Sequence, residues 1–203
     1  PVNRRQRQMC IRDSNTSDSI TENSASGTDA VHSSATFTLS SDVENLTLTG
    51  SSDIDATGND SANKLKGNSG ANTLTGNGGN DTLNGGSGDD TLDAGSGNDI
   101  LNGGSGNDIL NGGDDKDTAV FSDAANQVDL RITVSQNTGD GNDTLTTIEN
   151  VNAGGGDDTV YGNSEANFLS GRNGNDTLIG NEGNDTLNGG DGVDDLRLSL
   201  IHI

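Results

Sequence analysis

Aspartates recur at every ninth residue in the middle of the chain, always within a glycine-rich stretch. Four consecutive units carry them: GNGGNDTLN at 76–84, GGSGDDTLD at 85–93, AGSGNDILN at 94–102 and GGSGNDILN at 103–111. Glycine permits positive φ, so the first six positions of each unit can form a tight turn that directs backbone carbonyl oxygens inward. Such turns offer a cation hard oxygen ligands from carboxylates and carbonyls, and no softer ligand.

Calcium is the cation that this ligand set fits best. It takes six to eight oxygen ligands in flexible geometry, whereas Mg²⁺ demands a tighter octahedron and keeps its waters. The single cysteine and both histidines lie outside the repeats, which argues against zinc, copper or iron. Asn-Gly and Asp-Gly pairs favour ordinary turns by themselves. Because Asp81, Asp90, Asp99 and Asp108 are in phase, an ordinary turn is an insufficient explanation.

The elements that must position these turns are short strands. Position eight of the unit is apolar almost throughout, as in Leu65, Leu74, Leu83, Leu92, Leu101, Leu110, Val160, Leu169, Leu178, Leu187 and Leu196. Positions seven to nine allow one short strand with one inward side chain, and two units then make one coil of turn, strand, turn, strand. A fixed short period is typical of a stacked solenoid. The sequence therefore predicts an all-β fold, a parallel β-roll.

The repeats fall into two blocks that are out of register by a spacing that is not a multiple of nine, so we expect two rolls or one roll with an insertion. Residues 36–49 and 128–134 alternate in polarity and predict short strands. Val43–Leu46 and Ile148–Val151 are alike, and we expect both to cover the open end of a roll. The predicted regions are an adapter-like segment (1–14), a linker with starting strands (15–57, of which 15–35 is linker or a degenerate repeat), the first block (58–120), intervening strands (121–152), the second block (153–197) and a second adapter-like segment (198–203).

Both ends of the chain resemble translated sequencing-adapter sequence. The stretch RRQRQMCIRDS at 4–14 and the final LSLIHI at 198–203 read as opposite strands of one adapter, and such segments are set aside in fold reasoning. Residues 15–197 then hold no cysteine, so no disulfide is expected there. They carry 31 acidic and six basic residues, a formal charge of −25, against −22 for the whole chain.

Composition narrows the classes of function. So much negative charge excludes nucleic acid and acidic membrane surfaces as expected partners, and no apolar run approaches the roughly 20 residues of a membrane span. Hydrophobic residues make up only 27% of the chain, which is too few for a multilayer core. Low hydrophobicity with high charge is typical of a disordered chain, and bound cations would oppose the self-repulsion.

The units resemble the repeats-in-toxin (RTX) family, whose pattern GGxGxDxUx the stretch GGSGNDILN at 103–111 fits at every position. The resemblance covers most of 36–197. It implies a secreted, extracellular protein of Gram-negative bacteria, exported by a type I secretion apparatus, that stays unfolded at low cytoplasmic calcium and folds outside. It also implies calcium ions between turns of alternate units.

In that family one calcium ion lies between two turns. The first turn supplies the carbonyls of positions two and four and the aspartate of position six. The turn two units on supplies the carbonyls of positions one and three and its own position-six aspartate. Carried onto this chain, the resemblance implies about five strong sites: Asn77, Gly79, Asp81 with Ala94, Ser96, Asp99; Gly86, Gly88, Asp90 with Gly103, Ser105, Asp108; Gly95, Gly97, Asp99 with Gly112, Asp114, Asp117; Gly154, Gly156, Asp158 with Gly171, Asn173, Asp176; and Arg172, Gly174, Asp176 with Gly189, Asp191, Asp194.

The chain departs from the family pattern at four places. Asn63, Asn72 and Asn167 replace the carboxylate by a neutral amide, so their turns should bind calcium weakly or not at all. Asp185 is paired with Asn167, which makes its site doubtful. Asp115 replaces a glycine in the last unit of the first block, and we expect the roll to end there.

Two other classes of function remain open. Such repeats also occur as non-catalytic appendages of secreted proteases, lipases and epimerases, but this chain has no HExxH and no GxSxG motif, so we expect no catalytic site within it. The second class is a structural adhesin, surface-layer or ice-binding solenoid. A threonine column at Thr73, Thr82, Thr91 and Thr118 is broken by Ile100 and Ile109, and strand propensity on a solvated face explains it.

Overall fold

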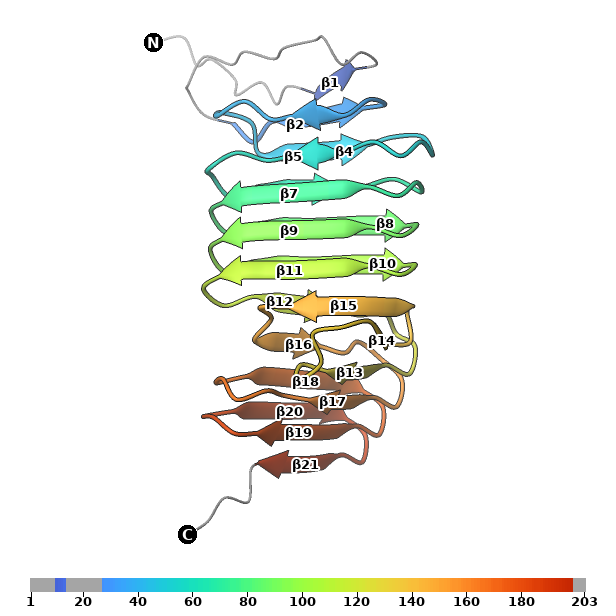
Figure 1. Cartoon of the computed structure of the whole chain (residues 1–203), viewed down its shortest axis with the longest axis vertical. Helices are drawn as coiled ribbons and strands as arrows, with labels where there is room; N and C mark the ends of the chain where they lie inside the picture. Colours follow the sequence, from blue (N-terminus) through green and yellow to red (C-terminus); the bar gives the residue numbers. More distant parts are fainter. Residues whose placement is uncertain (1–9, 14–26, 199–203) are drawn as a thin grey trace, which may run out of the picture.

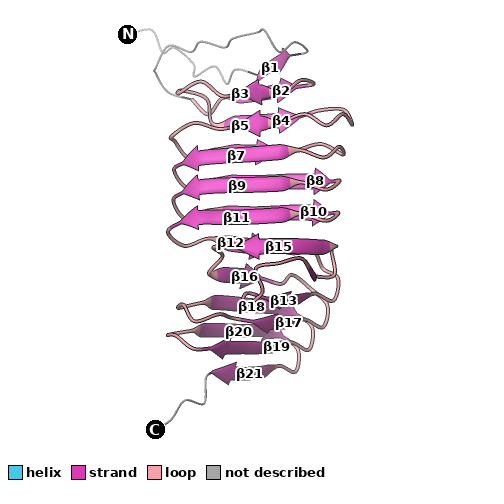
Figure 2. Cartoon of the chain, viewed as in Figure 1, coloured by secondary structure: helices cyan, strands magenta, loops and turns pink. Residues whose placement is uncertain are grey.

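The computed structural model describes residues 10–13 and 27–198 and shows no helix in them. The described chain winds into a column of stacked coils with strands on two opposite faces (Figures 1 and 2). The all-β parallel β-roll predicted from the nine-residue period is confirmed. Most of the adapter-like segments and the first half of the predicted linker (1–9, 14–26 and 199–203) lie outside the described residues.

One face is a single ten-stranded parallel sheet. Its order in space is β1 (Cys10–Asp13), β2 (Ala30–Ser33), β4 (Asn45–Leu48), β6 (Lys64–Lys66), β8 (Thr82–Ser87), β10 (Ile100–Ser105), β12 (Thr118–Val120), β16 (Asn150–Asn152), β18 (Phe168–Asn173) and β20 (Thr186–Asp191). Equivalent residues 18 apart pair directly in the repeats, as Leu83 does with Leu101. Two units therefore make one coil.

The opposite face consists of two sheets. A seven-stranded sheet has the order β14 (Gln136–Asn137), β15 (Asn142–Thr146), β11 (Ile109–Asp114), β9 (Thr91–Ser96), β7 (Thr73–Gly78), β5 (Ala56–Thr57) and β3 (Phe37–Thr38). A four-stranded sheet has the order β13 (Gln127–Asp129), β17 (Thr159–Tyr161), β19 (Thr177–Asn181) and β21 (Asp195–Leu198). Among the strands that the structure describes, only β14 and β15 pair in antiparallel fashion.

The core is a thin double row of apolar side chains between the faces. Position eight supplies most of it, and Leu65, Leu83, Leu101, Leu169 and Leu178 are completely buried. Toward the end of the roll the burial weakens, since Leu187 is only partly buried and Leu196 in β21 has 46% of its surface exposed. Since each strand contributes so little apolar surface, the coils depend on what holds the turns together at the two edges.

The two blocks form one roll with an insertion, because β12 of the first block pairs with β16 just before the second. On the other face the chain changes order. It passes from β12 to β13, which pairs with β17, and then returns through β14 to β15, which pairs with β11. Figure 1 shows β15 directly below β11, with β13 farther along the column. We call the junction between β15 and β13 the seam.

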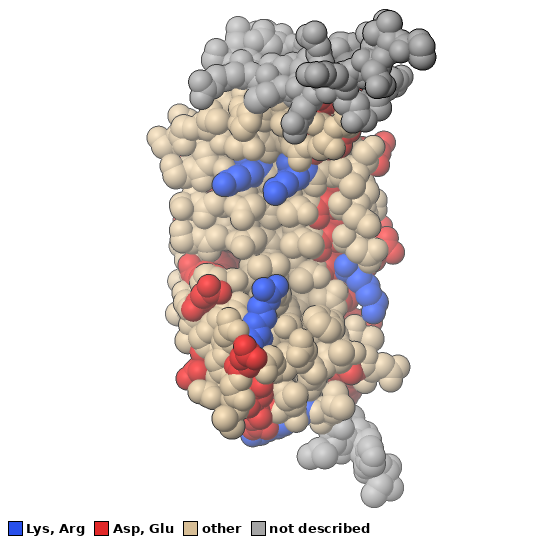
Figure 3. All heavy atoms as spheres, turned by 180° about the vertical axis from the view of Figure 1, so that it is seen from behind, with Lys and Arg blue, Asp and Glu red and all other residues tan. Residues whose placement is uncertain are grey.

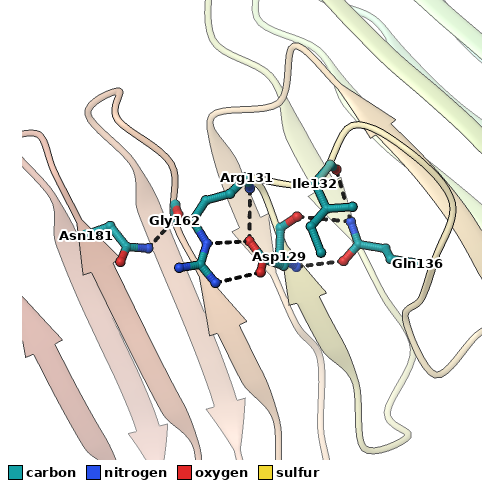
Figure 4. Close-up of polar contacts among 6 residues, drawn as sticks. All are labelled: Asp129, Arg131, Ile132, Gln136, Gly162 and Asn181. Carbon is teal, nitrogen blue, oxygen red and sulfur yellow. Dashed lines mark hydrogen bonds and ion pairs between the residues drawn. The ribbon is translucent and has the colours of Figure 1, made fainter.

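The strand predicted over 128–134 is wrong beyond its first residues. β13 ends at Asp129, and the chain turns there because the Gln136 side chain accepts a hydrogen bond from the Asp129 N–H (2.8 Å) and donates one to the Asp129 carbonyl (3.0 Å). Arg131 forms an ion pair with the Asp129 carboxylate at 2.7 Å (Figure 4). Val134, which the alternation placed in the strand, is 67% exposed.

Within residues 15–35, predicted to be a linker or a degenerate repeat, β2 pairs with β4 and continues the stack. Two other expectations about organisation are wrong. Val43–Leu46 and Ile148–Val151 cover no open end, because β4 and β16 lie inside the ten-stranded sheet. Asp115 does not end the roll: it adopts a left-handed conformation (φ 78°), and β12 follows it.

Candidate metal sites between stacked turns

The position-six aspartates stack in columns along the edges of the roll. In one column the backbone N–H of Asp81 donates to Oδ1 of Asp99 (2.6 Å), and that of Asp99 donates to Oδ1 of Asp117 (2.8 Å). The first block has a second column, in which the N–H of Asp90 donates to Oδ1 of Asp108 (2.8 Å). Each aspartate thus lies against the turn two units away.

The second block repeats this arrangement. The N–H of Asp158 donates to Oδ1 of Asp176 at 2.9 Å, and that of Asp176 donates to Oδ1 of Asp194 at 3.0 Å. The two turns of each of the five predicted sites are therefore neighbours in the stack. Asp185 receives its hydrogen bond from the N–H of Asn167 (3.1 Å). This turn pair therefore has an amide where the other pairs have a second carboxylate.

The second carboxylate oxygen of these aspartates has no partner. Oδ2 is buried without a hydrogen bond in seven of them: Asp81, Asp90, Asp99, Asp108, Asp117, Asp158 and Asp176. All seven side chains are at most 1% exposed. A buried polar atom left unsatisfied is destabilising by about 1–3 kcal/mol, and by more when it is charged. All seven belong to the sites predicted from the sequence, and a cation between the turns would satisfy them.

Burial also shifts the titration of these carboxyl groups. Desolvation raises the pKa of Asp81, Asp90, Asp117 and Asp158 to about 7, and a backbone hydrogen bond opposes this only in part. The neighbouring carboxylate of the column raises the pKa further, as Asp99 does for Asp81. A cation between the turns would act in the opposite sense and keep both carboxylates ionised.

Backbone carbonyls point across the same gaps. A Cβ on Gly95 or Gly97 would lie under 3.0 Å from the carbonyl oxygen of Asn77 or Gly79 in the turn before, and Gly97 has φ +127°. The carbonyls of positions two and four therefore face the next turn, and only glycine leaves them room. A Cβ on Gly76 would meet both Oδ2 of Asp81 and the carbonyl of Ala94. The position-one carbonyl thus faces back toward the earlier aspartate.

The position-three carbonyls are already partly used. Those of Ser105, Asp114 and Asp191 accept hydrogen bonds from the position-four N–H of the preceding turn, at 2.9, 3.4 and 2.8 Å. A carbonyl oxygen has a second lone pair, so these atoms can still bind a cation. Within residues 27–198, no three Asp, Glu, His or Cys side chains converge on one point, so carbonyls would supply most ligands.

Three acidic residues continue the columns and escaped sequence reasoning. The N–H of Asp108 donates to Asp143 Oδ1 (2.8 Å), that of Asp117 to Glu149 Oε2 (2.9 Å) and that of Asp29 to Glu44 Oε2 (2.7 Å). The signals were present: GDGNDTLT at 139–146 is a repeat turn, and the two similar stretches at 43–46 and 148–151 carry the glutamates. Asp143 differs in that its Oδ2 accepts a hydrogen bond from the Thr138 hydroxyl.

The asparagine turns are closed by their own side chains. The Nδ2 of Asn72 donates to the carbonyl of Ile54 (2.7 Å), and that of Asn167 to the carbonyl of Glu149 (2.8 Å). Oδ1 of Asn72 accepts from the N–H of Asn68 in its own turn (2.8 Å). An amide both donates and accepts, so these turns need no cation.

Comparison with known families decides which kind of repeat this is. The model of the RTX calcium-binding nonapeptide repeat matches four times, over residues 57–92, 85–119, 148–178 and 161–196, more than half of the chain. The chain belongs to the RTX repeat family. No curated protein matches it. The RTX repeat matches include all seven aspartates with an unpartnered Oδ2.

Membership in the RTX family identifies the chain as a calcium-binding repeat region. Such a β-solenoid of repeats is not catalytic in itself, and RTX proteins are typically secreted. None of the described residues belongs to a helix that could cross a membrane. In Figure 3, acidic side chains lie mainly near the edges and in the lower part of the face, and a few Lys and Arg side chains lie in its upper and middle parts.

Proposed function

We propose that this chain is a module of a secreted RTX protein that folds when calcium binds outside the cell. The observation that carries the proposal is the set of seven buried Oδ2 atoms without a partner, each at a gap toward which backbone carbonyls point. Calcium prefers this mixture of carboxylate and carbonyl oxygens. Its charge would also neutralise the pairs of stacked carboxylates.

The ligand sets that we propose are the five turn pairs headed by Asp81, Asp90, Asp99, Asp158 and Asp176. Asp99 and Asp176 each serve two of these pairs, so neighbouring ions would share a carboxylate. The turn pair of Asp108 and Asp143 is not counted among the strong sites, because Thr138 already holds the second oxygen of Asp143. We expect about five ions per chain.

The net charge of the chain makes its folding sensitive to the calcium concentration. The chain carries a formal charge of −22 and only 27% hydrophobic residues, so self-repulsion opposes the compact state when few cations are present. At the low calcium of a cytoplasm the turns that carry aspartate would remain open, which suits export by a type I secretion apparatus. At extracellular calcium the ions would link the turns, and the thin core would then suffice.

The test is a calcium titration of metal-free protein, followed by circular dichroism and calorimetry. We expect a β-sheet signal that increases strongly when calcium is added, about five ions bound, and little response to magnesium at the same concentration. An identical β signal with and without a chelator, or no calcium binding, would overturn the proposal. A protein of residues 15–197 should titrate like the whole chain, since we propose that 1–14 and 198–203 derive from an adapter.

A further inference from the structure

The turn that opens the seam is a disguised repeat unit. The stretch FSDAANQVD at 121–129 contains no glycine and no aspartate at position six, and sequence reasoning missed it. Its position-eight residue, Val128, is completely buried and pairs with Val160 of the next coil. Position six is therefore Asn126, which stacks on Asp158: the Asn126 N–H donates to Asp158 Oδ1 at 2.7 Å.

The Asn126 amide nitrogen contacts three backbone carbonyls at once. Its Nδ2 lies 2.9 Å from the oxygen of Ser122, 2.7 Å from that of Ala124 and 2.8 Å from that of Ala153. In unit numbering these are positions two and four of its own turn and position one of the next turn. They are three of the four carbonyl positions that would bind the ion in a calcium-binding turn pair.

The environment fixes which way the amide faces. Three acceptor oxygens surround the nitrogen, and the side chain is only 2% exposed, so the NH₂ group must point toward them while Oδ1 remains without a partner. Two N–H groups carry partial positive charge and together satisfy several acceptors. This is the electrostatic task that the cation performs elsewhere in the roll.

We propose that Asn126 is a built-in substitute for a calcium ion, whose amide nitrogen joins the turns 121–126 and 153–158 without metal. The proposal rests on the ligand scheme of the proposed function. This contact makes the seam a junction that does not depend on metal. The second block therefore stays attached to the first when calcium is absent. The contact also makes residue 126 the determinant of whether this gap accepts an ion.

The direct test is Asn126→Asp. The carbonyls of a calcium site are already in place, and the variant would add the missing carboxylate opposite Asp158. Calorimetry should find one more calcium ion per chain than in the unmodified protein. The matched control is Asn188→Asp, which adds the same charge on an exposed strand position and should leave the number of ions unchanged.

An unchanged number of ions in Asn126→Asp would overturn this proposal, whereas an unmodified protein that binds no calcium would overturn the proposed function instead. A second variant, Asn126→Ala, removes the donor without adding a ligand. In metal-free protein, hydrogen exchange of the β13 and β17 amides should rise by roughly tenfold or more, because three carbonyls lose their donor. Equal exchange rates in this variant and the unmodified protein would also contradict the proposal.

Discussion

The turns at 76–117 and those at 58–72 share one backbone path but are closed in different ways. In the first group each position-six carboxylate keeps one buried oxygen without a partner, as in Asp81 and Asp90. In the second group Asn63 and Asn72 donate from Nδ2 to the preceding turn and accept through Oδ1 from their own. The difference of one atom, O against NH₂, decides whether a turn requires a cation.

The comparison predicts a gradient of calcium dependence along a single roll. Stacked carbonyls at the edges always need something positive between them. Where asparagine supplies it, the coils can hold together alone. Where aspartate stands, the same gap is repulsive until an ion binds.

The largest effect on calcium binding should come from replacing an aspartate by an asparagine at Asp99. This residue belongs to two proposed sites, so Asp99→Asn should abolish two ions and weaken calcium-dependent folding of the first block. Calorimetry and a calcium titration by circular dichroism would measure both effects. The control is Asp93→Asn, at an exposed strand position whose carboxylate accepts a hydrogen bond from the Asn111 side chain (2.9 Å). Equal losses in the two variants would refute the site.

The core offers the next largest effect, and it should not depend on the kind of turn. Leu101 is completely buried, so Leu101→Ala should lower the free energy of unfolding by about 2–5 kcal/mol. Urea unfolding at saturating calcium would measure this, with the number of bound ions unchanged. A loss of ions in this variant would mean that core and edge cannot be separated.

Acidity should replace calcium in part. In the metal-free roll burial raises the pKa of Asp81, Asp90 and Asp117 to about 7 from an ordinary 3.8. The folded state then holds more protons than the unfolded chain between these values, so this stabilisation is full below about pH 4 and is lost as the pH rises through 7. Metal-free protein should therefore resist urea better at pH 5 than at pH 8.

With calcium bound, the pH dependence should reverse. The ion and the proton compete for the same carboxylates, so calcium affinity should fall toward pH 5. Midpoints of urea unfolding, measured at pH 5 and pH 8 with and without calcium, would test both predictions. A metal-free protein that is more stable at pH 8 would contradict the burial of these groups.

The smallest effect on calcium affinity and stability should come from position two of the unit 171–179. Arg172 adopts φ 73°, a conformation that costs a side-chain-bearing residue about 1–2 kcal/mol, and its charge opposes a nearby cation. Arg172→Gly should raise both calcium affinity and stability modestly. Asn77→Gly is the matched control, because Asn77 has φ 78° but also donates to the Gly58 carbonyl (2.9 Å), and its net effect should be near zero.

Much of the fold and of the candidate sites could be predicted from the nine-residue period. The recurrence of a leucine such as Leu83 and an aspartate such as Asp81 in each unit predicted the coil, the inward side chain and the pairing of turns two units apart. The family resemblance then indicated which carbonyls face a cation. These features are local and repeat in every unit, which is why the sequence carries them so clearly.

The seam could not be predicted in this way. Periodicity does not tell which coil an inserted segment joins, and β15 joins β11 although β13 and β14 come between them in the chain. Asn126 was missed because its unit has lost every glycine, and Glu149 was missed because the turn before it is shortened. Val134 alternates like a strand residue, but the Gln136 hydrogen bonds to Asp129 end the strand first.

Hydrogen exchange followed by mass spectrometry, with and without calcium, tests the central claim most directly. When calcium is removed, we expect amides of β8 to β11 to lose protection by more than about tenfold, the size of a single lost charged interaction of about 1.4 kcal/mol. Amides of β4 to β6, whose turns are closed by asparagine, should lose much less. Equal losses in the two regions, or protection of β8 to β11 that does not depend on calcium, would contradict the account.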